Sequence, residues 1–166
     1  MAILITNDDG LHAPGIEALI VGLSGLDEAI VIAPSQERSG ASHSLTMHSP
    51  LRMREVQDSC YAVDGTPVDC VYIGVHRVFD ETPGLVVSGI NLGANLGDDV
   101  FYSGTVGAAR EGALHGIPSL AVSLHLDGTR GEGSPNFASA VHFARQVVTW
   151  MKANPVPQET FLNLNI

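Results

Sequence analysis

Short runs of β-branched and aliphatic residues alternate with helix-length segments along this chain, and that alternation restricts its fold more than any other feature. Continuous apolar runs of this length, bounded by turn residues, are typical of buried strands. We predict strands over residues 2–6, 29–33, 44–47, 51–56, 61–63, 85–88, 119–124 and 161–166. We predict helices over residues 14–23, 67–79, 106–115 and 136–153. The alternation indicates an α/β fold with a mostly parallel sheet.

Several helix ends are marked by the residues that usually stand there. Pro14 occupies the expected first helical position, and Thr66 precedes a proline with Asp69 three residues later, which is a capping pattern. Thr105 is the expected N-cap of the helix after the glycine-rich segment. Residues 127–135 form a turn-rich segment, which we expect to be a mobile surface linker.

The charge balance excludes one class of partner. Lysine and arginine number 8 against 18 aspartate and glutamate, a formal charge of −10, and Lys152 is the single lysine. Binding along a nucleic-acid polymer needs a basic surface, so no such partner is expected. A small phosphorylated ligand remains compatible if a cation neutralises it locally. Cys60 and Cys70 are predicted to be buried free thiols.

No membrane span or secretory leader is recognisable in the sequence, so a cytoplasmic location and no membrane partner are expected. Apolar runs stay far short of the ~20 residues that a spanning helix needs. The first residues form a strand-like run without a basic leader region.

Two adjacent carboxylates follow the first predicted strand. Asp8 and Asp9 repel each other unless a proton or a cation joins them. Gly10 permits a sharp turn, which could aim both carboxylates into one space. The alternative interpretation is a solvated turn in which an aspartate caps the next helix.

A second polar segment, residues 34–44, follows the second predicted strand. Ser39 and the glycine after it could present a hydroxyl to a ligand, although a plain connecting loop is the more common interpretation of such a segment. His43 is an outside candidate for acid–base work, since a loop histidine more often caps or packs.

A third polar segment, residues 88–105, leads from a strand to a helix. That setting is typical of phosphate sites, because a helix start offers free N–H groups and the positive end of its dipole. Ser103, Gly104 and Thr105 would supply hydroxyl and N–H donors there. A glycine-rich turn with an ordinary threonine cap is the alternative.

The three polar segments are expected to meet, because ligands of parallel sheets bind beyond the carboxyl ends of the strands. Their donors are carboxylates, hydroxyls and amide carbonyls, which favour Mg²⁺, Mn²⁺ or Ca²⁺ over zinc. The residues by themselves therefore predict an α/β domain that binds a metal ion and a phosphate.

Four stretches of the sequence resemble the stationary-phase survival protein SurE family: ILITNDDGLHAPGI, APSQERSGASHSLT, DGTPVDCVYIG and VVSGINLGANLGDDVFYSGTVGAAREG. The resemblance implies a Rossmann-like, three-layer α/β fold. It implies a phosphoric monoester hydrolase, a metal-dependent 5′-nucleotidase that converts nucleoside 5′-monophosphates to nucleoside and phosphate. Some members of the family also hydrolyse short polyphosphate.

The resemblance also assigns roles to residues. The metal ligands would be Asp8, Asp9, Ser39 and Asn91, around one Mg²⁺ or Mn²⁺, with Ca²⁺ as a substitute in crystals. The phosphate contacts would be Ser103, Gly104 and Thr105, with Asn95 lining the same pocket. Asp8 and Asp9 are the expected catalytic residues, as candidates to take a proton from the attacking water. Asn7 would lie beside the ligands and orient them.

Members of the family are longer than this chain. The resemblance therefore implies that residues 1–166 form one catalytic α/β domain without the family's C-terminal extension, and that the family assembly is a homodimer or homotetramer. Two other functions stay open. One is a metal- and nucleotide-binding module without turnover. The other is a receiver-type phosphoacceptor domain, which is disfavoured because Ser88 stands where its acceptor aspartate would be.

Overall fold

The computed structural model describes residues 2–126 and 135–166. These residues form an open, seven-stranded sheet in the order β3-β4-β2-β1-β5-β6-β7. The strands are β1 (Ala2–Thr6), β2 (Glu28–Pro34), β3 (Met53–Gln57), β4 (Cys60–Val63), β5 (Leu85–Leu92), β6 (Ser119–Leu124) and β7 (Phe161–Asn165). β3 pairs antiparallel with β4, and the other neighbouring strands pair in parallel. The predicted α/β fold with a mostly parallel sheet is confirmed.

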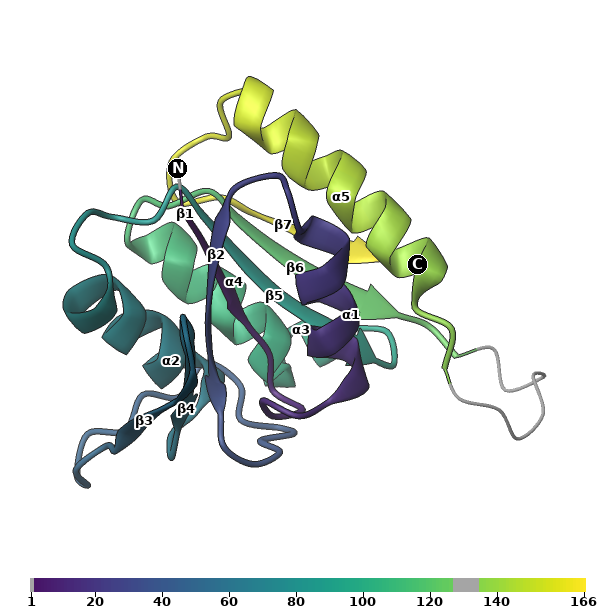
Figure 1. Cartoon of the computed structure of the whole chain (residues 1–166). Helices are drawn as coiled ribbons and strands as arrows, with labels where there is room; N and C mark the ends of the chain where they lie inside the picture. Colours follow the sequence, from purple (N-terminus) through teal and green to yellow (C-terminus); the bar gives the residue numbers. More distant parts are fainter. Residues whose placement is uncertain (1, 127–134) are drawn as a thin grey trace.

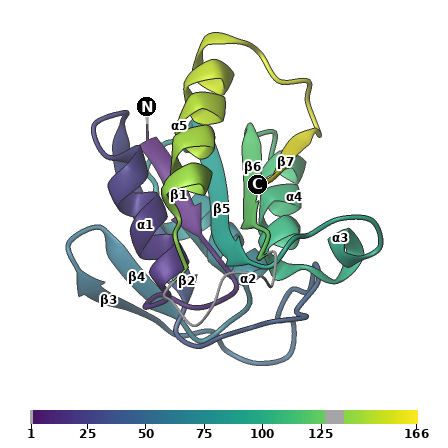
Figure 2. The same ribbon diagram turned by 90° about the vertical axis from the view of Figure 1, so that its right-hand side faces the viewer.

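Helices cover both faces of the sheet. They are α1 (Pro14–Leu23), α2 (Pro67–Ile73), α3 (Asp99–Tyr102), α4 (Gly104–Leu114) and α5 (Ala138–Ala153), with a π-helical turn η1 (Gly74–Val78) after α2. α1 and α5 lie on one face and α2 and α4 on the other, which gives three layers (Figure 1 and Figure 2). Each face buries its own aliphatic cluster, one around Ile16 and Leu19 of α1 and one around Cys70 and Val71 of α2. No helix in the described ranges is long and apolar enough to cross a membrane.

The strand order reverses direction at the centre of the sheet. β1 is the central strand, with β2 on one side and β5 on the other. The chain moves from β1 to β2 and later returns to β5, so the order reverses between β1 and β5. Ligands of open parallel sheets bind at such a reversal, outside the carboxyl ends of the strands. Asp8 follows the end of β1 there, and Asn91 lies near the end of β5.

Three predicted elements differ from the structure by more than two residues. Residues 44–47 are not a strand, because their polar backbone groups bond to side chains rather than to a neighbouring strand. β5 continues through Leu92, with a register shift against β6 between Ser88 and Asn91. The helix predicted over 67–79 ends its α-helical part at Ile73 and continues as η1. The linker predicted over 127–135 lies, except for its last residue, outside the described residues.

The start of α2 also anchors the loop that follows β2. Thr66 and Asp69 form the predicted capping box. The carboxylate of Asp69 accepts hydrogen bonds from the Thr66 N–H at 2.8 Å, the Thr46 N–H at 2.8 Å and the Thr46 hydroxyl at 2.6 Å. Asp69 is fully buried, and a buried carboxylate is tolerated when donors surround it in this way. Asp69 therefore joins the helix to a loop more than 20 residues away, as the separation of 23 between Thr46 and Asp69 shows.

Replacing Asp69 by alanine should lower the free energy of unfolding by about 3 kcal/mol, because three donors lose a charged acceptor. That loss corresponds to roughly 6–12 °C in melting temperature for a domain of this size. Thermal melts followed by circular dichroism measure it. The matched control is Asp80→Ala at an exposed position. Similar melting temperatures for the two variants would contradict the anchoring role of Asp69.

Candidate metal and phosphate site

The turn after β1 is tight and points its first aspartate inward. Asn7 donates from Nδ2 to the carbonyl of Gly10 at 2.9 Å. Gly10 has φ of 98°, and a Cβ there would lie 3.2 Å from the backbone carbon of Gln36, so a larger residue is disfavoured twice. The Asp8 side chain ends up buried at 5% exposure, while Asp9 is partly exposed.

Asp8 is held by the first turn of α4. The Thr105 N–H donates to Asp8 Oδ2 at 3.1 Å, and the Thr105 hydroxyl donates to Oδ1. A Cβ on Gly104 would lie 2.9 Å from Cβ of Asp8, so glycine is needed for this approach. Burial raises the pKa of Asp8 above its ordinary value, while the donors of Thr105 and Gly104 act in the opposite direction. The α4 dipole also favours a negative charge at this position.

Asp9 lies in a negative environment. Burial, followed by the charges of Asp8 and Glu37, raises the pKa of Asp9 to about 6, against a small opposing effect of the Leu92 backbone. Two of these three carboxylates are adjacent in sequence, and Glu37 comes from the loop after β2. The cluster therefore favours a proton or a cation at this point.

The loop after β2 lies directly on the acidic turn. The Arg38 N–H donates to the carbonyl of Asp8 at 2.7 Å. The Arg38 guanidinium is directed to the carbonyls of Asp64 and Gly65, so it does not neutralise the carboxylates. The Ser39 hydroxyl donates to Glu37 Oε1 at 2.6 Å, which leaves its lone pairs for another partner. A polar hollow of about 500 Å³ adjoins this loop, lined by residues 37–41 and Thr66.

The predicted site residues Asn91 and Asn95 differ in whether their side chains are free to bind a ligand. Asn91 donates from Nδ2 to the Gly93 carbonyl at 2.8 Å, so its Oδ1 stays free to act as a ligand. Asn95 is buried, and its donors are directed to Ser123 of β6 and Asn165 of β7 at 2.8 Å. In this structure Asn95 therefore ties a loop to the sheet, and its place in a phosphate pocket stays a prediction.

The sequence predicted Thr105 as the N-cap of α4, and this prediction is wrong, because the N-cap is Ser103. Ser103 Oγ accepts a hydrogen bond from the Val106 N–H at 3.1 Å. Thr105 lies inside the first turn, because its hydroxyl is engaged by Asp8 rather than by the helix. Its phosphate contact stays a prediction, and so do those of Ser103 and Gly104.

Sequence reasoning missed two acidic residues of this region. Glu37 faces Asp9 and Ser39, and only its position next to the Ser39 loop could have indicated this. Glu111 binds His43 through Nε2 at 2.7 Å. His43 is thereby held against α4 through Nε2.

The donor set fits a hard divalent cation. Asn7 Oδ1 and Ser88 Oγ are buried without a hydrogen-bond partner in the structure, and they flank the end of β1. Unpaired buried oxygens cost about 1–3 kcal/mol each, which a bound ion or its water can offset. Within the described ranges no three His, Cys, Asp or Glu side chains form a metal-binding group. A metal here would need the Ser39 and Asn91 oxygens beside Asp8 and Asp9.

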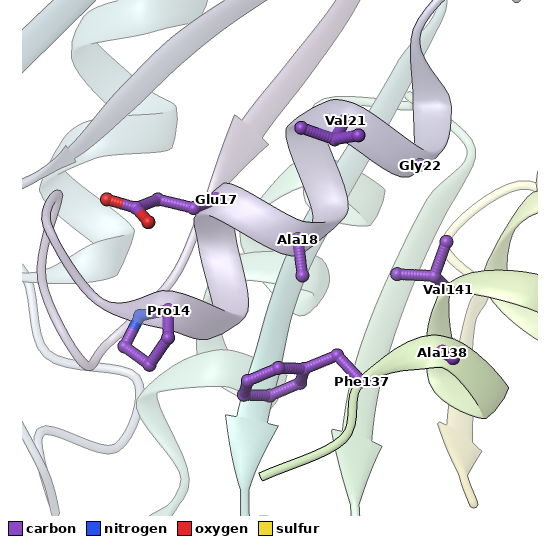
Figure 3. Close-up of a pocket in the computed structure, with 8 residues that line it drawn as sticks. All are labelled: Pro14, Glu17, Ala18, Val21, Gly22, Phe137, Ala138 and Val141. Carbon is purple, nitrogen blue, oxygen red and sulfur yellow. The ribbon is translucent and has the colours of Figure 1, made fainter. Parts of the chain in front are cut away.

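A second hollow has a different chemistry. It lies between α1 and the start of α5 and has a volume of about 420 Å³. Ala18, Phe137 and Val141 line it, and the Glu17 carboxylate points away from Phe137 and Val141 (Figure 3). The lining is mainly apolar, and Glu17 is its single acidic residue, so this groove does not resemble a metal site.

The fold and the site define a Rossmann-like α/β protein whose oxygen donors gather where the strand order of the sheet reverses. The family described as "Survival protein SurE" matches residues 3–166. The chain belongs to this family, and the family assignment replaces the receiver-domain alternative.

Relatives named "5'-nucleotidase SurE" are similar over the whole chain. The identity is 52% to the protein of Pelobacter propionicus, 51% to that of Geobacter sulfurreducens and 50% to that of Vibrio cholerae. Each match covers 100% of this chain and 66%, 62% and 64% of those proteins, respectively, so the chain spans just under two thirds of their length. The crystal structure of the SurE protein from Aquifex aeolicus is 42% identical, with a TM-score of 0.91, and the match covers 100% of this chain and 66% of that one.

The charge of Asp9 should make the stability of the metal-free protein depend on pH. The folded pKa is about 6, above the unfolded value of about 3.9. Ionisation therefore costs more in the folded state, and the parent loses stability as the pH rises from about 4 to above 6.

Asp9→Asn removes this charge, so in EDTA the variant should be more stable than the parent by about 1 kcal/mol at pH 8. The difference should vanish near pH 4. Urea unfolding at both pH values, with Asp80→Asn as the control, measures it. A constant difference across this range would show that Asp9 is not under electrostatic strain.

Proposed function

We propose that this chain carries the active site of a metal-dependent 5′-nucleotidase, which hydrolyses nucleoside 5′-monophosphates to nucleoside and phosphate. The observation that carries the proposal is the adjacent carboxylates of Asp8 and Asp9 after β1, of which Asp8 is buried and bonded to the first turn of α4. Relatives about 50% identical over the whole chain bear the name of this activity. The formal net charge of the chain is −10, so a phosphate substrate needs a cation at the site.

The proposed ligands of one Mg²⁺ or Mn²⁺ are Asp8, Asp9, Ser39 and Asn91. When bound, the metal ion supplies Lewis-acid chemistry, polarising phosphoryl oxygens and lowering the pKa of water. The donors come from three separate segments, which the sheet order and the Arg38–Asp8 backbone bond bring to one edge. No larger cofactor is needed for the reaction.

The protein residues would divide the remaining work. Thr105 positions Asp8, because both of its donors end on that carboxylate. Asp9 is the better candidate to accept the proton of the attacking water, because it is partly exposed and Asp8 is already engaged. The Ser103 hydroxyl accepts from Val106 and keeps its own proton to donate to a phosphoryl oxygen.

Phosphate release from AMP tests the proposal directly. Mg²⁺ or Mn²⁺ should support release, and excess EDTA should abolish it. Ser39→Ala should raise the Mn²⁺ concentration needed for half-maximal rate by about 10-fold or more, since metal sites depend on each ligand. Ser24→Ala, at an exposed helix end, is the control. Undiminished release in EDTA would refute the metal-dependent mechanism, and Mn²⁺ binding without release would indicate a binding module.

Thr105→Val keeps the shape of the residue and removes the hydroxyl that holds Asp8. We expect the rate with AMP to fall by about 10²-fold, on the scale of losing one buried donor at an active site. Stability should fall by about 1–3 kcal/mol, because a buried carboxylate loses a donor. The matched control is Thr149→Val on the exposed face of α5. A folded Thr105→Val protein with the parent rate would remove Thr105 from the machinery.

The expected assembly follows from the family resemblance, and the expected location follows from the sequence. A homodimer or homotetramer and a cytoplasmic setting stay predictions. Light scattering of the purified protein measures the assembly, and fractionation of expressing cells measures the location.

A further inference from the structure

A stripe of residues at four-residue spacing runs along one side of α4, and its two middle members contact the loop after β2. It consists of Ser103, Gly107, Glu111 and His115. At Gly107 a Cβ would lie 2.5 Å from the carbonyl oxygen of Ser42. The loop backbone therefore rests directly on the helix, two turns before its end.

One carboxylate oxygen of Glu111 contacts this loop, and the other contacts the end of its own helix. Its Oε2 lies 2.7 Å from His43 Nε2, and its Oε1 lies 3.2 Å from His115 Nε2. The Glu111 side chain is 12% exposed, so solvent competes little for these bonds. His115 is in turn packed by the rings of His76 and Tyr72, with centroids at 5.1 and 6.0 Å. The Glu111 carboxylate is thus fixed in one orientation toward His43.

The loop between these contacts carries Ser39. On one side, the Arg38 N–H is bonded to the Asp8 carbonyl at 2.7 Å. On the other side, the Ser42 N–H is bonded to the Tyr102 carbonyl at 2.9 Å, next to His43. Ser39 and the residue after it are exposed and have no bond to the helix in the described contacts. Their position depends on the two fixed ends.

We propose that Glu111 is a positioning residue of the metal site: by holding His43 against α4, it fixes the loop that presents Ser39 and so raises the affinity for a divalent cation. This inference rests on the proposed function for the metal, but its effect on the loop does not. Groups that orient a metal ligand commonly change metal affinity by about 10–100-fold when removed.

The first test uses metal-free protein and amide hydrogen exchange. In Glu111→Ala, the amides of Arg38 and Ser42 should exchange at least about 10-fold faster, because local opening needs fewer bonds to break. The Thr46 amide should not change, since Asp69 holds it independently. Unchanged exchange at Arg38 and Ser42 would overturn the proposal. An equal increase at all three amides would show a general loss of stability and would overturn it too.

The second test measures Mn²⁺ binding by the paramagnetic resonance of free Mn²⁺. Glu111→Ala should bind about 10-fold more weakly than the parent. Glu111→Gln keeps one acceptor oxygen and should lie closer to the parent. Glu17→Ala, at an exposed glutamate of α1, should bind as the parent does. Parent-like Mn²⁺ affinity in Glu111→Ala would overturn the proposal.

The two tests separate this inference from the proposed function. A parent protein that binds no Mn²⁺ would contradict the proposed function, and with it the effect of Glu111 on metal affinity. Hydrogen exchange would then still decide whether Glu111 fixes the loop.

Discussion

Asp8 and Thr105 are 97 residues apart in sequence, and their buried hydrogen bonds join the end of β1 to the first turn of α4. A carboxylate in this position has lost most of its hydration, and only its donors compensate for that loss. The helix start provides those donors together with its dipole. The contact therefore fixes where α4 begins and keeps one site carboxylate pointing inward.

The other parts of the site are arranged around this contact. The loop after β2 contacts Asp8 through the Arg38 N–H. Its later part is bonded to Asp69 and Glu111. In this region the charges of Asp8 and Glu37 both act on Asp9, while the guanidinium of Arg38 is directed elsewhere. Such an arrangement is unfavourable without a positive partner. The same imbalance that destabilises the metal-free state would give the site its affinity for a divalent cation.

Much of this could be predicted from the sequence, because the signals were local. The run before Asn7 is a strand with the predicted bounds, and Pro14 begins α1 as predicted. The three polar segments were placed at strand ends, where the strand order brings them to one edge. The capping box at Thr66 was likewise local, and the structure confirms it.

The errors and omissions arose where long-range contacts override local preference. Thr105 looked like a helix cap, but its hydroxyl goes to Asp8, and Ser103 caps instead. The bonds of Asn95 to Ser123 and Asn165 were likewise not foreseen, while its place in the phosphate pocket stays a prediction. The His43–Glu111 bond joins residues separated by 68 positions, which spacing alone does not reveal.

The most direct measurement is the anomalous scattering of Mn²⁺ in crystals of the protein soaked with that ion. The account predicts one strong peak within about 2.0–2.6 Å of carboxylate oxygens of both Asp8 and Asp9, the range of such metal–oxygen bonds. Ser39 and Asn91 should complete the contacts with their side-chain oxygens. A strong peak elsewhere with none at Asp8 and Asp9 would contradict the central claim that this acidic pair is built for a cation.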